Sequence, residues 1–96
     1  MRKTVYTVVT TKQFKKDYKL AIKRHMDVGL LEDIVAALSM GETLAEKHRD
    51  HALVGKWVGH RECHILPDWL LVYRFEDDVL ILTLSRTGSH SDIFGE

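Results

Sequence analysis

The sequence predicts a single α+β domain, spanning residues 1–96, in which an N-terminal strand and a two-helix hairpin pack on an antiparallel β-sheet. The composition, 45% apolar and 29% charged, is that of an ordinary globular domain of this length. The first half of the chain shows the period of two helices, and the second half shows short apolar runs separated by turns. Helices segregated from a run of strands are typical of the α+β class.

The N-terminal half supplies one strand and two helices. Residues 5–10 are short and β-branched, as in a strand, and one of the two threonines that end this run is suited to cap a helix. Apolar residues then recur at i, i+4 and i+7 from Phe14. After a break at Val28-Gly29, residues 30–38 repeat the helical period, and Gly41 is a C-terminal glycine cap. A short turn between two such helices predicts an antiparallel hairpin.

The C-terminal half is predicted to be rich in strands. Residues 42–55 have no clean period and are expected to form a loop with a short helix near 44–49. The near-continuous apolar run at 69–75 is typical of a central strand that is covered on both faces. The expected strands are 56–60, 61–66, 69–75 and 79–84, with turns at 67–68 and 76–78 and a polar tail that follows 86–89 and ends at Glu96.

Charge is polarised along the chain although the net charge is zero. Residues 1–26 carry eight basic groups and one acid, whereas residues 27–96 carry six basic and thirteen acidic groups. The first helix contributes Lys12, Lys15, Lys16, Lys19 and Lys23. These lysines form either a solvated face or a surface for a polyanion or an acidic partner. A single cysteine, no signal peptide and no apolar run long enough for a membrane span favour the cytoplasm.

Six histidines are the most unusual feature of the composition, and five of them lie at residue 48 or beyond. They are open to three interpretations: a metal site, scattered surface residues, or a proton-transfer site. The metal interpretation rests on His48 with His51 and on Cys63 with His64. The lone cysteine weakens this interpretation. So does the position of Cys63 and His64, because adjacent side chains on a strand point to opposite faces and cannot bind the same ion. We therefore expect no metal and no other cofactor.

The proton-transfer interpretation rests on four residues at predicted strand ends and turns. His64 and Asp68 flank the Pro67 turn, and His90 follows Arg86 past a glycine. Self-cleavage of RNA needs a base for the 2′-hydroxyl, an acid for the 5′-oxygen and a cation for the added charge on the phosphate. Two histidines, an aspartate and an arginine supply that set.

Two aromatic residues and the cysteine have alternative roles. Trp69 and Phe94 are able to stack on splayed bases, and Trp69 suits a buried strand equally well. Cys63 fits a buried strand residue better than a nucleophile. The sequence contains no P-loop, no dinucleotide-binding glycine motif and no Ser-His-Asp arrangement with a nucleophile elbow.

Several segments resemble a known family. Residues 55–73, from Gly55 through Pro67-Asp68-Trp69 to Tyr73, are similar to the signature of YafQ-type toxins of the RelE/ParE superfamily. Three other segments also fit this family: residues 86–95 near the C-terminal end, residues 50–53 just before the first segment, and Lys-Arg-His at 23–25. The resemblance therefore covers nearly the whole chain.

The resemblance implies a ribosome-dependent mRNA endonuclease with the microbial ribonuclease-like fold, part of a type II toxin–antitoxin system. It implies functional positions at His51, His64, Asp68, Trp69, Arg86, His90 and Phe94. In the implied mechanism, which uses no metal, Asp68 or His64 takes the 2′-hydroxyl proton and His90 protonates the 5′-oxygen. Arg86 stabilises the phosphorane, and His51 positions phosphate. A 2′,3′-cyclic phosphate follows.

The resemblance also implies partners. They are the ribosome and mRNA, and a cognate antitoxin whose N-terminal domain binds DNA, so that operator DNA is reached only through the complex; no membrane is involved. The lysine-rich helix is expected to lie on ribosomal RNA or to receive an acidic antitoxin segment. The main alternative is a non-enzymatic, gyrase-directed toxin of the ParE branch, which has no need of His51, His64 and His90 together. A catalytically inactive remnant is a third possibility that no residue favours.

Overall fold

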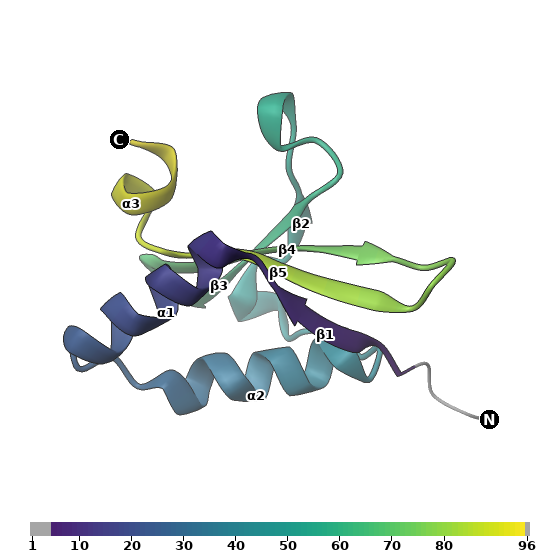
Figure 1. Ribbon diagram of the computed structural model, residues 1–96, viewed down its shortest axis with the longest axis horizontal. Helices are drawn as coiled ribbons and strands as arrows, with labels where there is room; N and C mark the ends of the chain where they lie inside the picture. The colour runs from purple at the N-terminus through teal and green to yellow at the C-terminus, as the bar shows by residue number, and fades with distance from the viewer. Residues whose placement is uncertain (1–4, 96) are drawn as a thin grey trace.

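A helical hairpin covers one face of a five-stranded sheet, and a short helix and a looped arm stand on the other face (Figure 1). The computed structural model describes residues 5–95. In chain order the elements are β1 (Thr7–Thr10), α1 (Lys12–Lys23), α2 (Val28–Ser39), η1 (Glu46–His48), β2 (His51–Ala52), η2 (Gly55–Trp57), β3 (Arg61–Leu66), β4 (Trp69–Glu76), β5 (Ile81–Gly88) and α3 (His90–Phe94), where η marks a single 3₁₀ turn.

Both long helices begin at side-chain caps. The Thr11 hydroxyl accepts a hydrogen bond from the Phe14 backbone N–H at 3.0 Å, which starts α1. The Asp27 carboxylate accepts from the Gly29 N–H at 3.1 Å, so the expected break at Val28-Gly29 is instead the first turn of α2. The buried faces of the helices consist of Phe14, Asp17, Ala21, Leu31, Ile34 and Leu38.

The strands follow the order β1-β5-β4-β3-β2. Three pairings are antiparallel, as predicted, whereas β1 runs parallel to β5. The two strands of this pair are far apart in the chain, so no tight turn forces them to run in opposite directions. Residues 69–73 of β4 are fully buried, which confirms the predicted central strand.

The structure corrects four predictions for the C-terminal half. Residues 79–80 lie in the turn before β5, which continues to Gly88, and β2 lies in the segment that was expected to be a loop. Residues 56–60 form no strand, because Gly55 and Gly59 adopt positive φ angles of 68° and 89° and turn the chain away from the sheet. The outer partner of β3 is instead the two-residue strand β2, which precedes Gly55. The expected polar tail contains α3, which Ser89 caps through a reciprocal bond with Asp92. We call residues 51–60 the arm.

The core has two unequal parts. The larger cluster lies between the two long helices and the sheet, and its residues include Phe14, Leu38 and Tyr73. The smaller cluster lies on the other face and joins Leu70, Val72 and Ile93, with side chains of the arm packed against it. Within residues 5–95, no helix has the length and apolar character needed to cross a membrane.

Candidate active site

The sheet face that carries the arm and α3 also collects the histidines. On β3, Glu62 is paired with Val72 and His64 with Leu70, so both project to the same face as the smaller core cluster. Cys63, between them, points into the larger core and is fully buried. His51 on β2 is paired with Glu62 and therefore joins the same face.

Glu62 is the centre of this group. Its side chain is only 6% exposed, and Oε2 lies 3.3 Å from His51 Nε2 and 3.6 Å from His64 Nε2. A buried carboxylate is costly unless cationic or hydrogen-bonding partners surround it. Glu62 is not among the predicted site residues, although its position two residues before His64 on a strand is a signal for a shared face.

The other ring nitrogens fix where the protons lie. His51 Nδ1 is 2.7 Å from the Arg49 carbonyl oxygen, and His64 Nδ1 is 3.1 Å from the Pro67 carbonyl oxygen. A carbonyl oxygen only accepts, so each Nδ1 carries a hydrogen. Each Nε2 then faces the Glu62 carboxylate either with a lone pair, which is repulsive, or with a proton, which is attractive. Nε2 of His51 and Nε2 of His64 are thus the ring nitrogens that face Glu62.

His90 and Asp68 form a second pair. His90 Nδ1 donates to Asp68 Oδ1 at 2.7 Å, and the same oxygen accepts from the His90 backbone N–H at 3.1 Å. These bonds, the side-chain bond first, hold the pKa of Asp68 below its ordinary value. With Nδ1 protonated, a neutral His90 ring presents the lone pair of Nε2. The His90 ring lies beside that of His64, with centroids 5.6 Å apart.

Three residues of this face, Glu62, His64 and His90, are called the site cluster below. One ligand atom from each lies within 4.8 Å of the others, which is close enough for all three to hold one metal ion. The expectation of no metal was argued from other residue pairs, and the opposite directions of Cys63 and His64 agree with that argument. Glu62 lies outside those residue pairs, and the alternation of side chains along β3 brings it to the face of His64.

Arg86 reaches this region through a β-bulge. Val72 is paired with Arg86 and Tyr73 with Leu84, so Ser85 is the extra residue of β5. In a regular strand without the bulge, Arg86, two residues after Leu84, would share the face of Leu84 and enter the helical core. The bulge instead turns its side chain toward the face of the site cluster.

The guanidinium of Arg86 is held by α1. Its Nε lies 2.7 Å from Asp17 Oδ2 and its Nη2 lies 3.3 Å from Asp17 Oδ1. The Thr87 backbone N–H donates to the same carboxylate at 3.1 Å. Because β1 pairs only with residues 81–84 of β5, the Asp17 carboxylate takes the place of a neighbouring strand at the free edge beyond them.

The two aromatic candidates occupy different environments. Trp69 is 1% exposed within the larger core, and its indole N–H donates to the Thr87 hydroxyl at 2.9 Å. Of the two predicted roles, base stacking and a buried position on a strand, the structure shows the buried position. Stacking on a base would require Trp69 to leave the core. Phe94 is half-buried beside His90, with ring centroids 6.5 Å apart. Trp57 of the arm, which the sequence analysis did not single out, lies 6.3 Å from Phe94.

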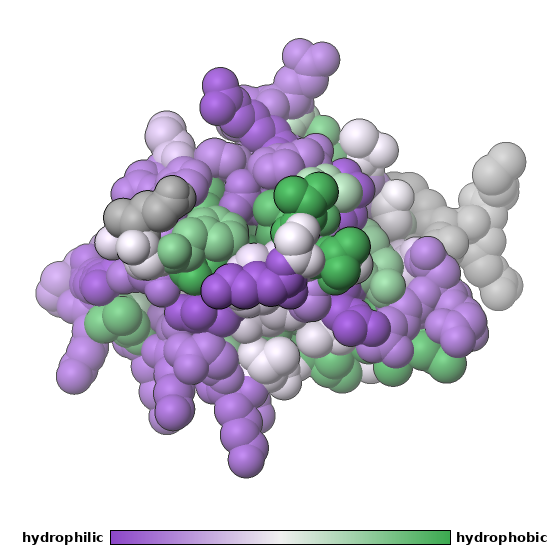
Figure 2. Space-filling model, turned by 90° about the horizontal axis from the view of Figure 1, so that it is seen from above, coloured by the Kyte–Doolittle hydropathy of each residue, from purple (hydrophilic) through white to green (hydrophobic). Residues whose placement is uncertain are grey.

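The arm and α3 rise from the same face (Figure 1). Seen from above, this side of the molecule shows apolar side chains among hydrophilic ones (Figure 2). The arm carries the two most exposed large apolar residues of the described chain, Val54 at 84% and Val58 at 73%. Away from this face, the lysines of α1 are all exposed, as predicted: Lys12, Lys15, Lys16, Lys19 and Lys23.

Comparison with known proteins agrees with this geometry. A family model described as a bacterial toxin of type II toxin–antitoxin system, YafQ, matches residues 6–95. The chain belongs to this family. It is 40% identical over 84 residues to the mRNA interferase toxin YafQ of Escherichia coli K12, which covers 86% of this chain and 89% of that protein. A putative toxin YafQ of Haemophilus influenzae is 36% identical over 86 residues, 84% of either chain.

Solved structures of the family share the fold. The toxin chain in the E. coli DinJ–YafQ toxin–antitoxin complex superposes with a TM-score of 0.86 at 37% identity, over 94% of this chain and 98% of that one. A metal-bound toxin from Helicobacter pylori superposes with a TM-score of 0.89 at 42% identity, over 94% and 100%. The predicted α+β architecture is thus confirmed as that of the YafQ toxins.

Proposed function

We propose that this toxin is an endoribonuclease that cuts mRNA on the ribosome and is neutralised by a cognate antitoxin. Membership of the YafQ family and the activity in the name of its E. coli relative support the reaction class. The observation that carries the proposal is the gathering of His51, His64 and His90 around Glu62 on one face. A toxin that only binds gyrase has no use for three histidines at one point.

His90 is the general base in this proposal. Its Nδ1–H is held by Asp68, so its Nε2 lone pair is free to accept the proton of the 2′-hydroxyl. Asp68 acts as the orienting partner, because its own lowered pKa makes it a poor proton acceptor. This assignment reverses the roles implied by the family resemblance.

His64 is the general acid. Its Nε2 lies 3.6 Å from the buried Glu62 carboxylate, which is placed to hold a proton on that nitrogen until the proton is transferred. As the 2′-oxygen bonds to phosphorus and the bond from phosphorus to the 5′-oxygen breaks, His64 Nε2 donates its proton to the 5′-oxygen. The products are a 2′,3′-cyclic phosphate and a 5′-hydroxyl.

Charge that develops on the phosphate needs cations nearby. Arg86, which is oriented by Asp17 and lies across Val72 from Glu62, and His51, whose Nε2 is 3.3 Å from Glu62 Oε2, are the residues proposed to supply them. The site cluster also fits a metal ion by its donor types, and such an ion would supply Lewis-acid charge at the phosphate. The steps above use only protein groups, and His64 and His90 are able to move protons only while they do not hold a metal.

The aromatic pair Phe94 and Trp57 provides a surface on which a base stacks next to His90. The α1 lysines are suited to phosphate contacts with ribosomal RNA, which add affinity without reading sequence. The proposed site of action is therefore the cytoplasm. Operator DNA is reached only through the DNA-binding domain of the antitoxin.

Expression of the toxin alone, followed by mapping of cellular mRNA 5′ ends, tests the reaction class. We expect new 5′ ends in translated regions, and we expect them to disappear when translation initiation is blocked. His64→Ala and His90→Ala should abolish the new ends. His25→Asn is the matched control, since His25 is exposed, has a φ of 59° that asparagine tolerates, and lies outside the site. Growth arrest without new 5′ ends would instead favour a protein-binding toxin.

The roles of the two histidines are separable with a modified mRNA. Replacing the 5′-oxygen at the cut by sulfur gives a leaving group that departs without a proton. We expect this substrate to restore cleavage to His64→Ala and not to His90→Ala. Rescue of His90→Ala alone would return the roles to those implied by the family resemblance.

A further inference from the structure

We propose that Asp50 is a positioning residue for His51, and that it acts by pinning the chain just before β2 to the opposite face of the sheet. The inference rests on the proposed function, in which His51 supplies charge to the phosphate, and it adds a residue outside the site cluster to the active site. The two residues are adjacent in the chain and point to opposite faces. Asp50 contacts the larger core on the helical face, whereas His51 faces Glu62.

The Asp50 carboxylate binds two donors on the helical face. Its Oδ1 accepts from the Tyr73 hydroxyl at 2.5 Å and from Arg61 Nε at 3.1 Å. Arg61 of β3 is paired directly with Tyr73 of β4, so both side chains project to this face. Tyr73 is fully buried, and burial, followed by the bond to Asp50, raises the pKa of its hydroxyl, which therefore stays a donor. Residue 50 is thus tied to two strands of the sheet.

The residue before Asp50 sets the orientation of the His51 ring. Arg49 has a φ of 47° and a ψ of 44°, in the left-handed region that residues other than glycine rarely adopt. In this conformation its carbonyl oxygen lies 2.7 Å from His51 Nδ1, which leaves Nε2 directed at Glu62. A strained backbone persists only where the surrounding structure holds it in place. The orientation of the ring therefore depends on the contacts that hold residue 49.

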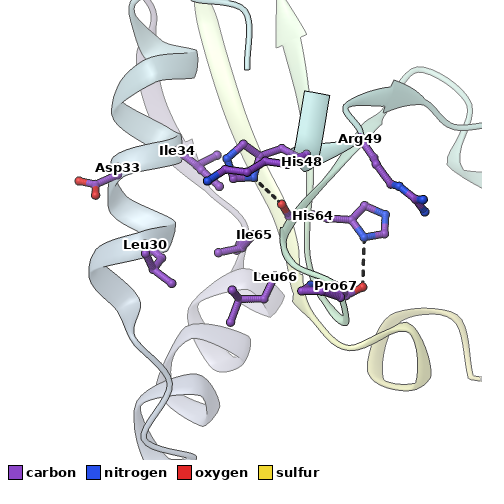
Figure 3. A pocket seen from close by; sticks show the side chains of 10 residues that line it. Leu30, Asp33, Ile34, His48, Arg49, His64, Ile65, Leu66 and Pro67 are labelled. Carbon is purple, nitrogen blue, oxygen red and sulfur yellow. Dashed lines mark hydrogen bonds between the residues drawn. The ribbon is translucent and has the colours of Figure 1, made fainter. Parts of the chain in front are cut away.

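Two anchors hold Arg49, one on each side of it in the chain. Before it, His48 Nδ1 donates to the His64 carbonyl oxygen of β3 at 2.7 Å (Figure 3). After it, the Asp50 carboxylate binds β3 and β4. The strand that follows, β2, is paired with β3 through only two residues, so its ladder adds little to this support. Loss of the Asp50 anchor should release the strain at residue 49 and let the His51 ring turn away from Glu62.

A double-mutant cycle of Asp50→Ala and His51→Ala tests the inference. The rate constant for the cut in ribosome-bound mRNA and the toxin concentration that gives half of the maximal rate are measured under single-turnover conditions. We expect Asp50→Ala to lower the rate constant by roughly ten- to hundredfold, as for a group misplaced by about 1 Å, and to leave the half-maximal concentration unchanged. In the His51→Ala background the same change should cost no more than about twofold, because the residue through which Asp50 acts is absent.

Glu32→Ala is the matched control. The Glu32 carboxylate also accepts from a tyrosine hydroxyl, that of Tyr18 at 2.8 Å, but it does so in the helical hairpin. This variant should cut at the rate of the parent. Asp50→Asn should keep most of the rate, because the amide oxygen still accepts from both donors. Thermal unfolding of the same proteins gives a temperature at which all of them are folded.

If Asp50→Ala fails to fold, Tyr73→Phe takes its place with Tyr18→Phe as its control, and the same pattern is expected in a weaker form. A parent-like rate would overturn the inference. So would an equal loss with and without His51, which would make Asp50 a purely structural residue. Parent-like cleavage by His51→Ala would also overturn it, while leaving the proposed function to His64 and His90. A parent chain that cuts no mRNA would contradict the proposed function itself.

Discussion

Asp17 is the residue whose removal most directly probes how α1 supports the site. Its carboxylate is 8% exposed and accepts from Arg86, from the Thr87 backbone and, at 3.0 Å, from Gln13. Asp17→Ala leaves the Arg86 guanidinium without its ion-pair partner. It also leaves the buried Thr87 N–H without an acceptor at the free edge of β5.

The magnitude follows from these contacts. Breaking a buried ion pair by removing one partner costs about 3–5 kcal/mol. Arg86 is 20% exposed, so water recovers part of that loss, and we expect a decrease in the free energy of unfolding of about 2–3 kcal/mol. For a domain of this length, such a decrease lowers the melting temperature by roughly 10–20 °C.

Denaturant and thermal unfolding of the purified variants measure the effect. Asp17→Asn should cost less, because the amide oxygen still accepts from the Thr87 N–H. Asp33→Ala, which removes an exposed acid from α2, is the control and should change stability by less than about 0.5 kcal/mol. At a temperature where Asp17→Ala remains folded, mRNA cleavage should still fall, since Arg86 has lost its orientation. An Asp17→Ala protein as stable and as active as the parent would refute the reasoning.

Three further predictions concern the Asp92 carboxylate, the Cys63 thiol and the site cluster. Arg24, which lies 2.9 Å from Asp92, holds the pKa of that carboxyl below its ordinary value of 3.8, so the pair stabilises the fold above this pH and the stabilisation is lost as the pH falls through the lowered value. Asp92→Asn should therefore make stability less dependent on pH in acid, as followed by thermal unfolding. Burial raises the pKa of the Cys63 thiol to about 12, so a thiol reagent at pH 8 should modify it only as fast as the protein unfolds. Added Zn²⁺ or Cu²⁺ should inhibit cleavage by binding the site cluster, and calorimetry should show that His64→Ala weakens this binding.

Elements with a strong local pattern were predictable from the sequence. The spacing of apolar residues placed α1 and α2, and the run from Trp69 identified the central strand. The grouping of His64, Asp68 and His90 also followed, because each lies at a turn or strand end where polar side chains approach one another.

Features set by tertiary geometry were not predictable in the same way. The role of Arg86 depends on one extra residue, Ser85, and the sequence around it gives no sign of a bulge. Residues 56–60 of the arm were predicted to be a strand, and the positive φ angles of Gly55 and Gly59 decide otherwise. Glu62 differs from these features because it was predictable: it lies two residues before His64 on a strand and so shares the face of His64. A single acid on a strand is usually solvent-exposed, which made a buried role unexpected.

Cleavage of a defined mRNA by the purified toxin, with and without translating ribosomes, tests the central claim most directly. We predict cuts only in ribosome-bound mRNA, with a 2′,3′-cyclic phosphate on the upstream fragment and a 5′-hydroxyl on the downstream fragment. His90→Ala should give none, and the cognate antitoxin should suppress the reaction of the parent. Intact mRNA after incubation with active toxin and translating ribosomes, or fragments with a free 3′-hydroxyl and a 5′-phosphate, would contradict the proposed acid–base mechanism.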